Sequence, residues 1–362
     1  MKKFLSTILS LALIISFIFC SANQVNAKNV DKVPESSNNF NHEQIIEDYI
    51  SSIDEGNWEK WLNCYSPSVK NLYIPFIQNK ENMINGLGVL GITSAKINCL
   101  KKIDNEFAPK VKELASYFKD SNNYETYLLD LNLKVKKDTE YFHNGQNYKL
   151  VVLVKDARQW NVGIFSGLPE EYLSFLIKEN TNSTAVRGIG YGLLNPGSTP
   201  STIRVLDRNG SLYTVNFPYF IKNVTQNEIG NLNFNYNAIK AQAMAAKMTG
   251  WWCKVAHYRD AYGADIMYGD VAFINGVPIN SNVANACNDI SSYRMLSDSG
   301  MLFYAAYYAG SYGWGGQSSG QLRQNGANFL ASEQGYSWSS ILHYYYNNSS
   351  YNNPNVGIVQ IY

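Results

Sequence analysis

Charged residues are scarce in this sequence, and their signs balance. Lysine and arginine number 30, and aspartate and glutamate 29, among 362 residues. Because no excess charge of either sign favours nucleic acid or an anionic membrane, we expect no nucleic-acid partner. Histidine is rarer still, and the two histidines within residues 41–168, His42 and His143, lie far apart. The sequence therefore predicts no catalytic set in residues 41–168. The balanced charge also predicts that binding depends on local shape.

Aromatic residues are what the sequence has in abundance. There are 27 tyrosines, 16 phenylalanines and 7 tryptophans. Tyrosine combines a flat apolar face with a hydroxyl group, which suits amphipathic ligands such as sugars, although packing in the core accounts for most of these rings. The length is sufficient for two domains with separate cores.

Residues 1–27 have the pattern of an export signal. Two lysines precede an apolar stretch over 4–20, and small residues stand before position 28, where cleavage is expected. We expect a secreted or cell-wall protein whose mature chain begins at Lys28 and continues as a polar tether over 28–40. The apolar stretch is nearly long enough to span a bilayer, so an uncleaved membrane anchor is the alternative. No later stretch is apolar enough to do so.

Residues 41–168 combine helical and strand-like patterns. Apolar residues at helical spacing run to a break at Gly56, a short helix follows, and Pro67 and Pro75 are expected to interrupt the chain after it. Alternating strands over 127–135 and 148–154 are separated by an Asn-Gly turn, and one more strand is expected over 160–165. This order predicts a cone-shaped α+β domain. Its stretch D-Y-I-S-S-I-D-E-G-N-W-E-K-W weakly resembles the nuclear transport factor 2-like superfamily, whose domains bind a ligand or support a neighbour.

A linker over 169–200 is expected to separate this domain from a second one over 201–362. The linker begins with a short helical pattern over 170–180 and is then rich in Gly, Ser, Thr, Asn and Pro. The second domain opens with a hairpin that turns at 207–210, and a strand pair is expected near 300–308. The fold class is thus α+β with two domains, and a fragment from about residue 200 onward is expected to fold alone.

The clearest helix of the chain begins after residue 235. Asn235 or Asn237 is expected to cap it. Lysines recur every seven residues on one side, at Lys240, Lys247 and Lys254, and are expected to form a solvated stripe. Small and apolar residues recur at helical spacing on another side and predict a buried face, namely Ala238, Ala241, Ala245, Met248 and Trp252.

Glu228 is an isolated acid just upstream of this helix. No other carboxylate lies between Asp207 and Asp260. Partial burial raises the pKa of such a group toward the range of a general acid. The alternative is an exposed residue at a helix end. The residues beyond Asp260 supply further aspartates, but their spacing does not place any of them opposite Glu228.

Four stretches together resemble the stage II sporulation protein D and amidase-enhancer family (SpoIID/LytB). N-A-I-K-A-Q-A-M-A-A-K-M-T is similar to the family's helix signature, and Y-F-I-K-N-V-T-Q-N-E to the segment before it, which places the family's glutamate at Glu228. L-F-Y-A-A-Y-Y-A-G-S-Y-G-W-G-G-Q resembles the family's strand and Gly-Gly turn, and Y-S-W-S-S-I-L-H-Y-Y-Y its closing element. The resemblance covers about residues 202–346.

This resemblance implies a lytic transglycosylase that acts on peptidoglycan strands stripped of their peptides. Glu228 would serve as both acid and base while the sugar's own C6 hydroxyl attacks, giving a 1,6-anhydro product without a cofactor. It also implies cell-wall remodelling in sporulation, with other cell-wall hydrolases as further partners. The side chains and glycines expected to bind the strand are Lys240, Tyr308, Tyr312, Gly313, Trp314, Gly315 and Gly316.

The sequence departs from the family pattern at positions that matter for activity. The residues after Glu228 differ, the glycine turn is enlarged, and Lys247 stands where the family has arginine, so the bidentate fork of a guanidinium is missing. A non-catalytic cell-wall binding or amidase-enhancing module on the same fold is therefore the alternative function.

The four cysteines beyond residue 27 leave three alternatives open. Cys64 and Cys99 fall in the first predicted domain, and Cys253 and Cys287 in the second, so each domain has room for one disulfide. Cys253, His257 and Cys287 are zinc ligands in a second interpretation, but a fourth ligand is missing, and no metal is predicted. Free buried thiols are the third.

Overall fold

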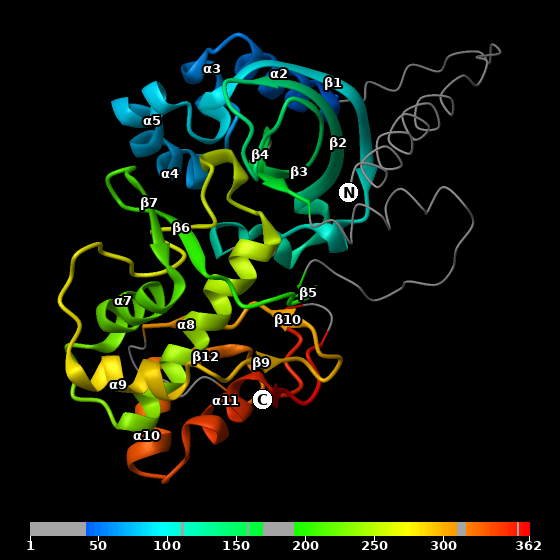
Figure 1. The fold of residues 1–362 in the computed structure, drawn as a ribbon. Helices are drawn as coiled ribbons and strands as arrows, with labels where there is room; N and C mark the ends of the chain where they lie inside the picture. The colour runs from blue at the N-terminus through cyan, green and yellow to red at the C-terminus, as the bar shows by residue number, and fades with distance from the viewer. Residues whose placement is uncertain (1–40, 110–111, 158, 169–191, 310–315, 353–354) are drawn as a thin grey trace, which may run out of the picture.

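The computed structural model describes residues 41–109, 112–157, 159–168, 192–309, 316–352 and 355–362. The predicted signal peptide and tether, the helical pattern at 170–180, and four of the expected strand-binding residues, at positions 312–315, lie outside these ranges. Helices and several small sheets alternate in the described part, so the α+β prediction is confirmed. Figure 1 shows a strongly curved sheet at one end of the molecule and a long helix, α8, that runs through the middle of the other half.

The N-terminal part, residues 41–168, opens with four helices: α2 (His42–Asp54), α3 (Trp58–Asn63), α4 (Pro67–Gln78) and α5 (Lys80–Asn85). The helical spacing and the break at Gly56, whose φ is +63°, are confirmed. The expected interruption by proline is wrong. Pro67 begins α4, where a missing N–H costs nothing, and Pro75 lies inside α4 near its last turn.

Four antiparallel strands form the curved sheet in the order β1-β2-β3-β4. They are β1 (Ile92–Ile103), β2 (Tyr124–Val135), β3 (Gly145–Asp156) and β4 (Gln159–Gly167). The last three confirm the predicted strands. The sequence missed β1, because its outer positions carry lysines and asparagine and break the alternation of apolar residues. Short 3-10 turns lie at Gly88–Gly91, Asn105–Phe107, Lys112–Leu114, Tyr117–Lys119 and Ser121–Asn123.

The C-terminal part, residues 192–362, contains small sheets around helices. The predicted hairpin is confirmed as β6 (Thr202–Leu206) and β7 (Leu212–Asn216), and β8 (Ile266–Met267) adds to it in parallel. The expected strand pair near 300–308 is wrong in its pairing. Instead β10 (Leu302–Phe303) pairs with β5 (Leu193–Leu194), and β11 (Ala306–Tyr308) pairs in parallel with β12 (Gln321–Arg323). The remaining elements are β9 (Met295–Leu296) with β13 (Gln360–Ile361), the 3-10 turn Asp260–Tyr262, and α9 (Ser281–Asp289), α10 (Gln324–Ser332) and α11 (Trp338–Tyr346).

Helix α8 (Tyr236–Ala256) is the centre of the C-terminal part, with α7 (Phe217–Ile229), α9, α10 and α11 packed around it. Its Asn235 cap and its buried alanine face are confirmed. The solvated lysine stripe is wrong, because helices surround α8 on several sides. Lys247 is 3% exposed and donates to the carbonyl oxygens of Ser291 and Tyr293. Lys254 forms an ion pair with Asp265 at 3.1 Å.

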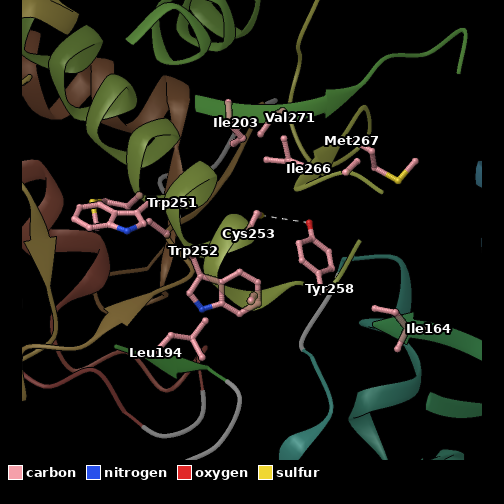
Figure 2. Close-up of a cluster of buried hydrophobic side chains, with 14 of the residues drawn as sticks. Ile164, Leu194, Ile203, Trp251, Trp252, Cys253, Tyr258, Ile266, Met267 and Val271 are labelled. Atoms are coloured by element: carbon pink, nitrogen blue, oxygen red, sulfur yellow. Dashed lines mark hydrogen bonds between the residues drawn. The ribbon is translucent and has the colours of Figure 1, made fainter. Parts of the chain in front are cut away.

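Part of the predicted linker belongs to the core of the C-terminal part. Besides β5, the carbonyl oxygens of Gly192 and Pro196 accept hydrogen bonds from the indoles of Trp252 and Trp251. Figure 2 shows Leu194 in the same apolar cluster as the end of α8. Residues 192–196 therefore fasten the chain to α8.

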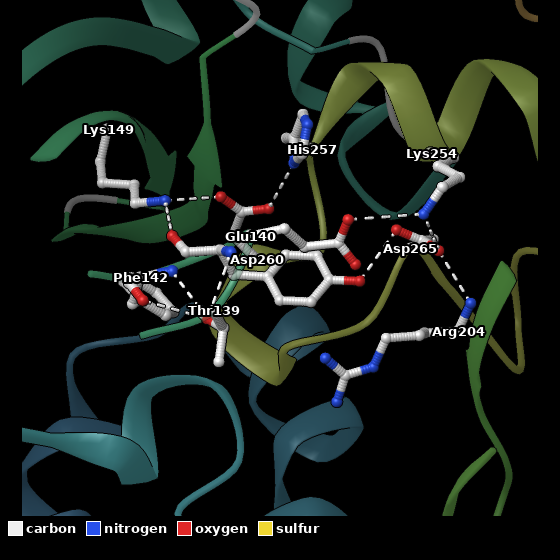
Figure 3. Close-up of polar contacts among 10 residues, drawn as sticks. Thr139, Glu140, Phe142, Lys149, Arg204, Lys254, His257, Asp260 and Asp265 are labelled. Atoms are coloured by element: carbon white, nitrogen blue, oxygen red, sulfur yellow. Dashed lines mark hydrogen bonds and ion pairs between the residues drawn. The ribbon is translucent and has the colours of Figure 1, made fainter. Parts of the chain in front are cut away.

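The two parts share a buried contact surface around residues 257–265. The ring of Tyr73 stacks on Tyr262 at 4.3 Å between centroids. Nearby, Lys149 Nζ lies 2.5 Å from Asp260 Oδ2, and both side chains are at most 5% exposed (Figure 3). Arg259, itself buried, forms ion pairs with Glu113 of the N-terminal part and with Asp270. Buried charges on each part are thus neutralised by the other.

Candidate functional site

Glu228 is the penultimate residue of α7. Asn216 caps this helix by accepting from the backbone N–H of Tyr219, and Pro218 stands in its first turn, where proline is favoured. The helix buries Phe220 and Val224 against α8, so the position of Glu228 is fixed by a packed element. A carboxylate at the C-terminal end faces the negative end of the helix dipole, so helix electrostatics do not favour it there.

Both carboxylate oxygens of Glu228 accept hydrogen bonds from neutral donors. The backbone N–H of Ala272 donates to Oε1 at 3.0 Å, and the side-chain amide of Gln324 donates to Oε2 at 2.9 Å. Gln324 is the first residue of α10 and is 4% exposed. Glu228 itself is partly buried, so the interpretation as an exposed helix-end residue is wrong. Its carboxylate joins three segments that are distant in sequence.

Tyr307 is a residue of this site that the sequence interpretation missed. It lies on β11, and its hydroxyl group is buried without a hydrogen-bond partner among the described residues. Burial, followed by the nearby charge of Glu228, raises the pKa of Tyr307 well above its usual value, so the O–H remains protonated. Tyr307 therefore places an uncommitted hydrogen-bond donor close to Glu228. The repeated aromatic residues of the stretch at 302–317 were the available signal, but the expectation fell on its neighbour, Tyr308.

Tyr308 and Gly316 are the expected strand-binding residues of the 302–317 stretch that the structure describes. The guanidinium of Arg323 lies over the Tyr308 ring, 5.0 Å from its centroid, and the Tyr308 hydroxyl lies 3.5 Å from that of Tyr351. Successive strand residues point to opposite faces, so Tyr308 and Tyr307 face different ways. Gly316 is exposed, with open space where a Cβ would stand.

Lys240 lies near the N-terminal end of α8 and takes no part in the hydrogen bonds around Glu228. Its Nζ lies 3.9 Å from Asp289 Oδ2 and 5.1 Å from the centre of the Tyr236 ring. Tyr236 donates to the same aspartate at 3.0 Å. Among the described residues, no hydrogen bond or ion pair joins Lys240 to Glu228.

Three aspartates downstream of Glu228 are committed to other partners. Asp270 pairs with Arg259, and Asp260 with Lys149. Asp265 accepts from Tyr141 and from the backbone of Arg204 and pairs with Lys254. In the ranges that the structure covers, no second carboxylate shares a hydrogen bond with Glu228, so its chemistry is that of a single acid surrounded by neutral groups.

Cys64 and Cys253 are free thiols that donate hydrogen bonds to oxygen atoms. Cys64 Sγ donates to the carbonyl oxygen of Lys60 at 3.4 Å, and Cys253 Sγ to the hydroxyl of Tyr258 at 3.5 Å (Figure 2). Burial raises the pKa of the Cys253 thiol well above its usual value. Cys99 and Cys287 are free as well, so the disulfide alternatives are wrong for this structure. No group of three or more His, Cys, Asp or Glu side chains in its described ranges is placed to hold a metal ion.

Comparison with known proteins adds no assignment. No protein-family model matches the chain, and no curated protein matches it either. Among the helices in the described ranges, none combines the length and the apolar character needed to span a bilayer.

Proposed function

We propose that this protein is a peptidoglycan lytic transglycosylase that acts on peptide-stripped glycan strands. The observation that carries the proposal is Glu228, a partly buried carboxylate held by Ala272 and Gln324, with no second carboxylate bonded to it among the described residues. Hydrolysis of a glycosidic bond ordinarily needs two carboxylates. Attack by the substrate's own hydroxyl needs one group that first donates and then accepts a proton, and Glu228 fits that requirement.

The reaction balances with groups that this chain and its substrate supply. Protonated Glu228 gives its proton to the glycosidic oxygen as the bond from that oxygen to the anomeric carbon breaks. The C6 hydroxyl of the same sugar forms the new bond to the anomeric carbon and passes its proton to the Glu228 carboxylate, which restores the acid. Tyr307, whose O–H has no partner among the described residues, supplies a hydrogen bond to the substrate or to Glu228 during these transfers.

The proposal extends to the arrangement of the whole chain. The N-terminal part is a nuclear transport factor 2-like domain and the C-terminal part a sporulation protein D-like domain, linked to export by the signal at residues 1–27. In this proposal the protein remodels the cell wall, in connection with sporulation, alongside other cell-wall hydrolases.

A non-catalytic wall-binding or amidase-enhancing module is the second candidate, and Lys247 is the observation that favours it. This lysine stands at the position of the family's arginine, but its ammonium group is directed to the carbonyl oxygens of Ser291 and Tyr293, at 2.7 and 2.6 Å. It is therefore not available to a substrate.

Digestion of purified, peptide-free glycan strands by the mature protein tests the proposal. Glu228→Gln keeps the shape of the side chain and removes proton transfer, so cleavage should fall by ~10²–10⁴-fold while strand binding and thermal stability stay unchanged. The neighbouring Gln324 amide can rotate to present its oxygen to the new amide. Glu333→Gln, at an exposed position after α10, is the matched control.

Mass spectrometry of the products separates the mechanisms. Anhydro ends support a transglycosylase, whereas reducing ends mean that water attacks and that a further carboxylate takes part. If the wild type binds strands without cutting them, the second candidate is the better description.

A further inference from the structure

A pocket of about 580 Å³ lies between the two parts of the chain. The N-terminal part contributes the loop around Leu87 and the turn between β2 and β3, and the C-terminal part contributes Arg204 of β6. Because its walls come from both parts, this pocket exists only in the assembled chain. Pockets that bind small ligands often lie at such junctions.

Arg204 presents a charged group to this pocket without using it in the fold. Its backbone N–H donates to Asp265 (Figure 3), while its guanidinium lies over the ring of Tyr141, 5.1 Å from the centroid. The guanidinium has no hydrogen bond or ion pair with any described residue. Lys137, an exposed residue of the same lining, likewise has no such partner in the described ranges. Two cations are thus available to a ligand.

The acids of the pocket wall are already engaged. Glu140 lies 3.6 Å from Lys254 Nζ. Asp138 accepts two hydrogen bonds from Asn144, at 2.9 and 2.8 Å. These acids also limit how much negative charge the pocket tolerates, so a singly charged anion fits better than a doubly charged phosphate. A guanidinium that lies over a tyrosine ring and has no hydrogen-bond partner among the described residues keeps its N–H groups for the bidentate pairing that carboxylates offer.

We propose that this pocket binds a small carboxylate-bearing ligand through Arg204 and Lys137. Apolar side chains in the lining, Leu87, Val135 and Phe142, would contact the uncharged portion of the ligand. If the proposed function is right, two sources offer this chemistry: the lactyl carboxylate of muramic acid in the strand and the terminal carboxylate of a wall peptide. The choice of these sources rests on the proposed function, whereas the site itself does not.

Calorimetric titration of the mature protein with matched probes tests the site. N-acetylmuramic acid is compared with N-acetylglucosamine, and D-alanyl-D-alanine with its C-terminal amide, because only one member of each pair carries a carboxylate. We expect one carboxylate probe to bind and its counterpart without a carboxylate not to. Which acid binds distinguishes the strand from the peptide as the source.

The variants separate binding from stability. Arg204→Gln should weaken the acid by at least about tenfold, the worth of a charge-assisted hydrogen bond. Lys137→Gln, at an exposed position where folding is not at stake, should weaken it by a smaller factor. Arg208→Gln, on the exposed hairpin turn and outside the pocket lining, should leave the affinity unchanged. Thermal melting of each variant shows whether it is folded.

Three results would overturn the proposal: neither acid binds at millimolar concentration, the counterpart without a carboxylate binds equally well, or Lys137→Gln and Arg208→Gln have the same effect. Glu228→Gln should bind the acid as the wild type does. A wild type that cleaves no strands but still binds the acid through Arg204 would contradict the proposed function and leave this site standing.

Discussion

The side-chain amide of Gln324 lies 2.9 Å from Oε2 of Glu228, across 96 residues of sequence. This contact ties the start of α10 to the end of α7, and the buried glutamine has little freedom to leave it. Gln324 is therefore a positioning residue for the proposed acid and base.

Gln324→Leu removes this donor and should lower kcat for strand cleavage by ~10–100-fold, the loss of one hydrogen bond to a charged group, with little change in KM. Gln324→Asn keeps the amide on a shorter chain and should recover part of the rate. Steady-state kinetics on peptide-free strands give both constants. Gln334→Leu, at an exposed position, is the control. An equal rise in KM would mean that Gln324 serves binding instead.

Tyr307→Phe should separate activity from stability. Its hydroxyl is buried and has no partner among the described residues, so its removal should not lower the melting temperature, whereas the loss of a donor next to Glu228 should slow cleavage. Tyr346→Phe is the opposite case, because that hydroxyl donates to the carbonyl oxygen of Ala306 at 2.8 Å. This variant should cost about 1 kcal/mol of unfolding free energy. If Tyr307→Phe cleaves strands normally, Tyr307 has no part in the reaction.

The local sequence pattern was sufficient to predict those helices and strands whose neighbours in space are also adjacent in the chain. The α2 helix, the β2–β3 hairpin and the β6–β7 hairpin all follow from spacing and turn residues, and they are confirmed. The lysines of α8 show the limit of this approach. A recurrence of seven residues indicates one side of a helix, but whether solvent or α9 lies there depends on contacts between distant segments.

The site was predictable only as far as Glu228 itself. Its hydrogen-bond donors are Ala272 and Gln324, which lie in segments without a regular sequence pattern. The packing of α10 and of the loop before α9 brings these donors to the Glu228 carboxylate. Tyr307 was within a stretch already singled out. Strand alternation does not say which of two adjacent tyrosines faces the acid until the partners of β11 are known.

A fragment of residues 200–362 should not fold as a stable unit, contrary to what the linker composition suggests. It would lack Glu113, Lys149 and Tyr73, and would leave the buried Arg259 and Asp260 without their N-terminal partners. The ring of Tyr262, fully buried in the whole chain, would also lose its cover, and burial of a large apolar side chain contributes ~1.5–3 kcal/mol, a large part of the stability of an ordinary domain. Circular dichroism melts of the fragment and of residues 28–362 provide the comparison. Cooperative melting of the fragment would show that the interface is dispensable.

The stability of the full chain should depend on the ionisation of His257. Burial alone would lower the pKa of this imidazole, but the carboxylate of Asp260, with 3.4 Å between Nδ1 and Oδ1, outweighs burial and raises it above the usual value of 6.5. The folded state then binds the proton more tightly than the unfolded state. Its stabilisation is fully present below pH 6.5 and is lost as the pH rises through the folded-state pKa.

The wild type should therefore lose its stability advantage over His257→Asn as the pH rises from 6.5 through the folded-state pKa. Urea unfolding of both proteins across that range measures it. His143→Asn, at an exposed position, should show the same pH dependence as the wild type. A constant difference between wild type and His257→Asn would mean that the ion pair does not change the proton affinity.

The ion pair between Lys149 and Asp260 joins residues that are 111 positions apart. A chain that emerges N-terminus first, from a ribosome or a translocation channel, exposes the curved sheet and its lysine before the aspartate arrives. At ~5–20 residues per second, the delay in synthesis is on the order of ten seconds. During that interval Lys149 lacks its carboxylate partner, and the Tyr73 ring lacks the Tyr262 ring that stacks on it. The nascent N-terminal part is thus a natural client for a holding factor, and truncated chains that end before residue 260 are candidates for proteolysis.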